Sequence, residues 1–111
     1  MKQNIDGIKI TPLKIISDNR GSVMHMLRSD SDVFEKFGEI YFSTIFKDSI
    51  KAWHLHKEAT LNYACIFGKV KLALFDDRTQ SITYGLYQEL YLSLDSYSLI
   101  TICLLYTSDA A

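Results

Sequence analysis

Short runs rich in Ile, Val, Tyr, Phe and Thr recur along this chain at intervals of about eight to twelve residues. Turn residues separate them, as at Asp18-Asn19-Arg20-Gly21 and Phe67-Gly68-Lys69. Evenly spaced short strands are typical of an all-β sandwich or barrel. The predicted strands cover residues 8–10, 13–16, 23–27, 39–46, 50–56, 61–67, 70–75, 81–84, 90–94 and 98–102, and one helical turn is predicted at 32–37.

The length of 111 residues suffices for one domain and not for two. Twelve Lys and Arg against 13 Asp and Glu give a net charge of −1, which argues against a nucleic-acid partner. No apolar run reaches the roughly 18 residues of a membrane span, and no secretory signal opens the chain, so we expect no membrane partner. Cys65 and Cys103 lack a metal-type spacing, which indicates a reducing, cytoplasmic location, with Cys65 a buried and inert thiol.

Residues 103–111 resemble the translated read-through of a transposon-type sequencing adapter. Such a segment is excluded from reasoning about the fold. We therefore expect the domain to comprise residues 1–102, as the N-terminal part of a longer domain, and residues 103–111 to be a non-native tail.

Two predicted strands alternate between an apolar face and a face with reactive groups. Such a polar face lies in water in an open sheet, or lines a ligand cavity in a barrel, and alternation leaves both open. In residues 52–56, His54 and His56 share one face. In residues 39–46 the two faces are Glu39, Tyr41, Ser43, Ile45 and Ile40, Phe42, Thr44, Phe46.

The run Trp53-His54-Leu55-His56 is the strongest candidate for chemistry. Two histidines at positions i and i+2 of a strand project side by side, so they can share a metal ion or a substrate, or serve a structural role. His54-x-His56 followed by Gly68 resembles the first motif of the cupin superfamily. The motif's metal-binding glutamate falls at Leu61, which cannot ligate a metal, so the metal-free branch, with no metal site and no cofactor, fits better.

That branch includes the dTDP-4-dehydrorhamnose 3,5-epimerases, which the chain resembles in order from about Leu13 to Ile102. The turn at Asp18-Asn19-Arg20-Gly21 resembles the family's Asp-x-Arg-Gly. Glu39-x-Tyr41-x-Ser43 takes the place of its Gln-x-Asn-x-Ser strand, and Lys51-Ala52-Trp53-His54-Leu55-His56 that of Arg-Gly-Leu-His-Tyr-Gln. Asp76-Asp77-Arg78, with Ser81, Thr83 and Gly85, matches a later motif, although its residues alone indicate a turn with a local ion pair.

The resemblance implies a cupin-like jelly-roll barrel, truncated at its C-terminus, that is a homodimer at full length. It implies epimerisation of a nucleotide-linked 4-keto-6-deoxy sugar, with His54 as the base that removes a proton beside the ketone. It also implies that Arg20 and Lys51 contact the diphosphate. The remaining substrate-binding residues would be Glu39, Tyr41, Ser43 and His56.

Several positions depart from the family pattern. Leu61 replaces the lysine that stabilises the enolate, and strict alternation puts Lys51 on the Trp53 face unless the strand bends at its start. The family's acidic tyrosine and the aspartate that orients the histidine would lie beyond Ile102, so we expect this truncated chain to be inactive. Alternative functions are a nucleotide-sugar 3,4-ketoisomerase, a non-catalytic sugar- or nucleotide-binding module, and a metal-dependent cupin.

Overall fold

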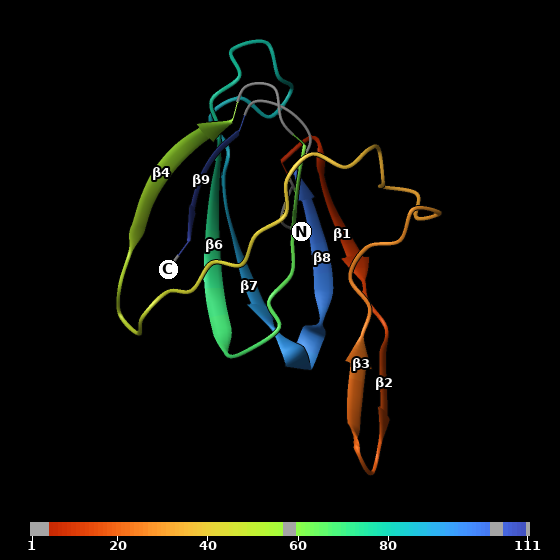
Figure 1. Cartoon of the computed structure of the whole chain (residues 1–111). Coiled ribbons are helices and arrows are strands. Elements are labelled where there is room, and N and C mark those ends of the chain that lie inside the picture. The colour runs from red at the N-terminus through yellow and green to blue at the C-terminus, as the bar shows by residue number, and fades with distance from the viewer. Residues whose placement is uncertain (1–4, 57–59, 103–105, 111) are drawn as a thin grey trace.

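A computed structural model gives the architecture of the chain (Figure 1). It describes residues 5–56, 60–102 and 106–110, and for 52–56 and 106–110 it describes the backbone alone. The elements are β1 (Ile8–Pro12), β2 (Ile15–Asp18), β3 (Gly21–Met24), β4 (Lys51–His56), β5 (Leu61–Tyr63), β6 (Lys69–Asp76), β7 (Tyr87–Ser93), the 3₁₀ turn η1 (Leu94–Ser96), β8 (Ser98–Ile102) and β9 (Tyr106–Ala110). Within the described part of the chain, no helix is long and apolar enough to cross a bilayer.

The strands form two main sheets and one hairpin, all with antiparallel pairing. One sheet has the order β4-β9-β6-β7, and the other has the order β1-β8-β5. The hairpin β2–β3 extends away from both (Figure 1). The all-β fold class expected from the sequence is therefore confirmed.

The core lies between the two main sheets and is filled with aliphatic side chains. Leu72 and Leu74 of β6 meet Ile100 and Ile102 of β8, and Ile5 of the N-terminal segment joins them, each at most 3% exposed. Burial of each such side chain contributes about 1.5–3 kcal/mol, as an upper estimate. Cys65 belongs to this cluster and is a free thiol, as predicted.

A polar cluster around the buried Asp76, the Asp76 network of Asp76, Arg78, Ser81 and Thr83, closes the end of β6. Asp76 Oδ1 accepts hydrogen bonds from Arg78 Nε at 2.9 Å and Arg78 N at 3.1 Å. Asp76 Oδ2 accepts from Arg78 Nη2 at 2.9 Å and from the Ser81 and Thr83 hydroxyls, both at 2.6 Å. The turn with a local ion pair that the sequence predicts is confirmed, and it is a buried one.

The same network holds the N-terminal segment against the turn. Arg78 Nη2 donates to the carbonyl oxygen of Asp6 at 2.7 Å, and the Asp6 amide donates to Thr83 Oγ1 at 3.0 Å. Burial alone would raise the pKa of Asp76, but hydrogen bonds from Arg78, Ser81 and Thr83 outweigh it and hold that pKa far below its usual range. Every acceptor site of this carboxylate is engaged, so its role is structural.

Three predicted elements are absent from the described residues. Residues 81–84 form a turn, because the Ser81 and Thr83 hydroxyls bond to Asp76 in place of a strand neighbour. Residues 32–37 have one turn bond at their start, from the Phe34 amide to the Ser31 carbonyl, which does not nucleate a helix. Residues 39–46 have strand-like alternation, but no described strand lies beside them to complete a ladder.

The segment predicted to be a non-native tail contributes a strand to the sheet. Tyr106–Ala110 forms β9, which pairs with β4 on one side and with β6 on the other. Ladder hydrogen bonds join main-chain atoms, so many sequences can occupy such a place between two strands. The non-native origin of residues 103–111 stays a prediction.

Candidate functional site

The predicted site centres on β4, where the backbone pairing fixes each position in the sheet. Through β9, His54 pairs with Ser108, which pairs with Leu74 of β6. His56 pairs with Tyr106, which pairs with Asp76. The side chains of Trp53, His54 and His56 lie outside the described part of the structure, so their contacts stay predictions.

By the strand register, positions 51 and 54 fall on the same face of the sheet, because β4 contains an irregularity between them. Between Lys51 and His54 the register shifts: three steps along β4 match two along β9, from Ala110 to Ser108. One extra residue of this kind is a β-bulge, which reverses the alternation of faces. The bend that the sequence required for Lys51 to join the histidine face is therefore present.

The structure brings two predicted binding residues, Lys51 and Ser43, into contact. Lys51 Nζ donates to Ser43 Oγ at 2.8 Å, and both residues are exposed. A lysine ammonium retains two further N–H groups after one such bond. The pair thus presents a cation and a hydroxyl together at the start of β4.

Arg20 lies at the tip of the β2–β3 hairpin, away from β4 (Figure 1). Its guanidinium Nη2 donates to Asp18 Oδ2 at 2.8 Å, and its backbone amide donates to Asp18 Oδ1 at 2.8 Å. These bonds from Arg20 lower the pKa of Asp18. Within one chain, Arg20 and Lys51 are therefore not brought together.

Glu39 and Tyr41 lie on the segment that forms no strand, and both are exposed. Their predicted place on a strand face is therefore wrong for the described chain, because that face needs a neighbouring strand to define it. Ser43, the third of these predicted residues, is joined to Lys51 of β4 by a hydrogen bond of its side chain.

Leu61 lies on β5 and packs against the core cluster, so hydrocarbon occupies the place of the family's lysine. The neighbouring Asn62 accepts a hydrogen bond at Oδ1 from Thr101 Oγ1 at 2.7 Å. Since successive residues of a strand face opposite sides, Asn62 is turned away from the face that carries Leu61. Among the described side chains, which exclude those of His54 and His56, no three His, Cys, Asp or Glu could hold a metal ion.

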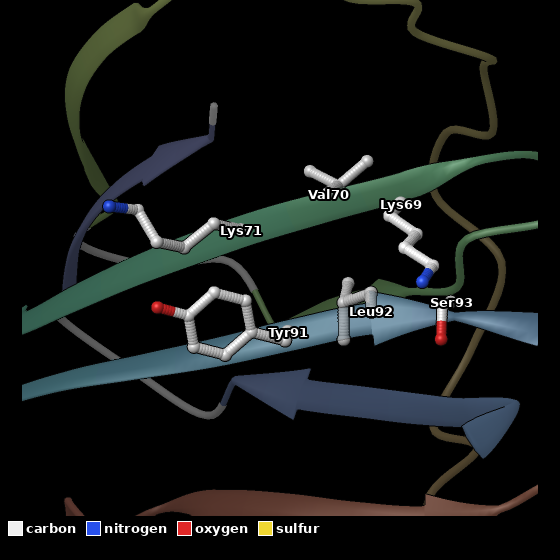
Figure 2. Close-up of a pocket in the computed structure, with 6 residues that line it drawn as sticks. All are labelled: Lys69, Val70, Lys71, Tyr91, Leu92 and Ser93. Carbon is white, nitrogen blue, oxygen red and sulfur yellow. The ribbon is translucent and has the colours of Figure 1, made fainter. Parts of the chain in front are cut away.

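Sequence reasoning did not single out a shallow hollow of about 440 Å³ on β6 and β7. Figure 2 shows Lys71 and Tyr91 extending in the same direction and Lys69 approaching Ser93. Glu89 accepts hydrogen bonds from Tyr87 and Tyr91, and its Oε1 lies 3.8 Å from Lys71 Nζ. Lys69 Nζ likewise lies 3.9 Å from Asp95 Oδ2, so each lysine of the hollow has an acid beside it and the hollow offers little surplus of positive charge for a diphosphate. Its other lining residues are Val70 and Leu92.

Tyr97 is another feature that the sequence alone does not reveal, because nothing in the sequence distinguishes it from the other tyrosines. It is 6% exposed, and its buried hydroxyl has no hydrogen-bond partner among the described residues. Burial raises the pKa of this phenol, so it stays protonated at neutral pH. Only the three-dimensional burial separates Tyr97 from the exposed Tyr84 and Tyr91.

No protein-family model matches the chain. It is 32% identical over 84 residues to the probable low-salt glycan biosynthesis epimerase Agl13 of Haloferax volcanii, covering 74% of this chain and 54% of that protein. It is also 32% identical over 98 residues to the spore coat polysaccharide biosynthesis protein SpsL of Bacillus subtilis, covering 88% and 65%. The chain thus spans less than two thirds of the length of these curated relatives.

Solved structures of similar proteins identify the fold. A dTDP sugar isomerase from Desulfovibrio desulfuricans superposes with a TM-score of 0.93 at 35% identity, covering 96% of this chain and 69% of that one. The dTDP-4-dehydrorhamnose 3,5-epimerase of Bacillus anthracis, solved with TDP and PPi, superposes at 0.66 over 100% of this chain and 68% of that one. At 13% identity the second match shows the fold alone. The cupin-like jelly roll expected from the sequence is confirmed.

Proposed function

This chain belongs to the dTDP-4-dehydrorhamnose 3,5-epimerase family of the cupin superfamily, and on that premise we propose that it epimerises a nucleotide-linked 4-keto-6-deoxy sugar. Relatives are sugar epimerases and isomerases, which supports an isomerase-type activity. Because the chain covers only part of each relative, the proposal concerns the full-length protein.

In the proposed reaction, His54 removes a proton from the carbon next to the C4 ketone. The electron pair of the broken C–H bond moves into the carbonyl and forms an enolate. Return of a proton to the opposite face of that carbon inverts its configuration. An imidazole suits this step because its ordinary pKa, about 6.5, makes both protonation states accessible near neutral pH.

The observation that carries this proposal is the register of β4. His54 shares a cross-strand row with Leu74, and the Leu74 side chain is 0% exposed within the core. Residues directly opposite one another in an antiparallel sheet have their side chains on the same face. The row therefore supports a place for position 54 on the interior face of the sheet.

The contact between Lys51 and Ser43 supports a binding role for the start of β4. We propose that Lys51 takes a diphosphate oxygen and that Ser43 fixes the ammonium in position. The 35% identity to a protein named as a dTDP sugar isomerase supports a nucleotide-sugar ligand. Arg20, Glu39, Tyr41 and His56 are proposed as further contacts with that ligand.

The test replaces His54 with Asn in the full-length protein and measures both turnover and binding of the keto sugar. We expect H54N to lose about 10²–10⁴-fold in kcat while it retains substrate affinity, since general base catalysis contributes that much. His25→Asn is the matched control, because His25 follows β3, away from β4 in sequence and fold. Turnover of H54N at the rate of H25N would contradict the role of His54.

A 3,4-ketoisomerase is a second candidate, favoured by the 35% identity to a protein named as a dTDP sugar isomerase. Both reactions begin with removal of a proton beside the ketone. They differ in product, because ketoisomerisation moves the carbonyl from C4 to C3 whereas epimerisation leaves it in place. Carbon NMR of the product distinguishes them. Tight binding without any conversion would favour the non-catalytic module, with which the hydrocarbon at Leu61 agrees.

A further inference from the structure

Ile5, the first residue that the structure describes, fills part of the interior although it belongs to no strand. Its side chain is 1% exposed and is a member of the core cluster between the two main sheets. Gly7, at a φ of +93°, makes the turn that leads from this segment into β1, and the Ile8 amide donates to the Ile5 carbonyl oxygen at 3.2 Å. The chain therefore places an apolar side chain inside the fold before its first strand begins.

Three hydrogen bonds hold the main chain of Ile5 and Asp6 to side chains of β7 and of the turn before it. The Ile5 amide donates to Gln88 Oε1 at 2.9 Å. The Asp6 amide donates to Thr83 Oγ1 at 3.0 Å, and Arg78 Nη2 donates to the Asp6 carbonyl oxygen at 2.7 Å. The partners lie 72 to 83 positions away in the sequence, so these bonds tie the segment before β1 to the other main sheet.

The partners of this segment belong to the two cross-strand rows that contain positions 54 and 56. Gln88 pairs with Leu74, which lies in the row of position 54. Thr83 donates to Asp76, which lies in the row of position 56. In Figure 1 the start of β1 and the end of β4 lie at the same, upper end of the molecule. Residues 5 and 6 are thus held at the end of the interior where the two histidine positions lie.

We propose that Ile5 and Asp6 form a plug that closes this end of the interior and keeps water away from the base, with Thr83 and Gln88 as the positioning residues that hold it. This inference rests on the proposed function. β7 lies three strands from β4, about 14 Å across the sheet, so the plug acts by excluding water and not by touching the base. A closed site prevents a transferred proton from being lost to the solvent.

In D₂O the reaction has two outcomes once the base has taken the proton from carbon. Delivery of a deuteron to the opposite face gives the epimer. If the base first exchanges its proton for a solvent deuteron and returns it to the original face, the substrate is recovered with deuterium on that carbon. Water beside the base favours the second outcome. The deuterium in recovered substrate, divided by the product formed, therefore measures leakage and does not depend on the fraction of folded protein.

The first test measures this ratio by NMR in the full-length protein. Thr83→Val removes the hydroxyl that accepts from the Asp6 amide and should raise the ratio at least about threefold. Thr83→Ser retains a hydroxyl and should stay within about twofold of the wild type. A ratio in T83V equal to that of the wild type would overturn the plug.

Thr101→Val is the matched control, because it removes another buried threonine hydroxyl. Thr101 is 1% exposed, and its hydroxyl donates to Asn62 Oδ1 at 2.7 Å. Its side chain lies on the face of β8 turned away from Ile100 and Ile102 of the core. The variant should lose stability without any change in the ratio. An equal rise of the ratio in T101V and T83V would show that general loosening, and not the plug, admits water.

The second test is independent of the reaction and follows amide hydrogen exchange by NMR. The amides of Ile5 and Asp6 should exchange at least about 100-fold more slowly than in an unfolded chain. Thr83→Val should speed exchange at Asp6, and Gln88→Leu should speed it at Ile5. Exchange of both wild-type amides at the unfolded rate would overturn the plug. Slow exchange in a protein that does not turn over the sugar would contradict the proposed reaction and not the plug.

Discussion

The Asp76 network and residues 37–50 differ in which side chains they bury: the network buries a charged group, whereas residues 37–50 expose apolar ones. In the network, a buried carboxylate is paired with a half-buried guanidinium and accepts bonds from three side chains. In residues 37–50, Phe42 and Phe46 face solvent, and residues 39–46 pair with no described strand. The polar groups of the network find their partners within the chain, whereas residues 37–50 leave large apolar side chains exposed.

The largest expected effect is a fall in the free energy of unfolding when the Asp76–Arg78 ion pair loses its carboxylate. Asp76→Asn leaves the Arg78 guanidinium, 15% exposed, without its counter-charge. Removal of one partner from a buried pair costs about 3–5 kcal/mol. Urea unfolding should show a loss in this range for D76N and less than about 0.5 kcal/mol for the exposed neighbour Asp77→Asn. Equal losses in both variants would show that the network does not stabilise the turn.

Acid should remove the same stabilisation reversibly. The pKa of Asp76 is lowered in the folded chain, so its contribution is fully present above the usual carboxyl pKa of 3.8 and falls as the pH drops below that value. Below it the unfolded chain binds a proton that the folded chain does not. We expect the unfolding free energy of the wild type to fall more steeply below pH 4 than that of D76N. Parallel slopes would contradict this account.

A smaller loss is expected from one hydroxyl of the network. Thr83→Val removes the donor to Asp76 Oδ2 and the acceptor for the Asp6 amide while it keeps the side-chain shape. Buried groups left without partners cost about 1–3 kcal/mol. The exposed Thr79→Val is the matched control and should be close to neutral. If T83V unfolds like T79V, the N-terminal segment is not held by this residue.

The smallest effect is expected at the hairpin tip. Asp18→Asn breaks the pair with Arg20, whose side chain is 86% exposed. Exposed pairs of this kind are screened by solvent and contribute little. The midpoint of thermal unfolding should therefore not change measurably in D18N. A clear fall in the midpoint would mean that the hairpin, like the Asp76 network, contributes to the stability of the fold.

Much of the fold follows from periodicity in the sequence. The sequence predicts β1, β4, β6, β7 and β8 within a few residues of their observed bounds. For β1, β6, β7 and β8 the reason is that their apolar sides match the core that they fill. Residues 39–46 have the same periodicity and form no strand. Alternation reports that a segment can pair, but the presence of a neighbour depends on the whole topology.

The candidate site is less accessible to sequence reasoning. The bulge in β4 puts position 51 on the same face of the sheet as position 54. It adds one residue to one strand and has no signature in the alternation of the sequence. The contact between Lys51 and Ser43 depends on that bulge and on the path of residues 37–50. The turn and ion pair of Asp76 and Arg78, by contrast, can be predicted from the sequence, because the two residues are close together in it.

The central claim is that His54 removes a carbon-bound proton beside the ketone, and one measurement tests it most directly. The full-length protein is incubated with the nucleotide-linked 4-keto-6-deoxy sugar in D₂O, and proton NMR follows each ring position. We predict that deuterium enters at C3 or C5 and that H54N abolishes this exchange. A sugar that binds and keeps all its ring protons would contradict the claim.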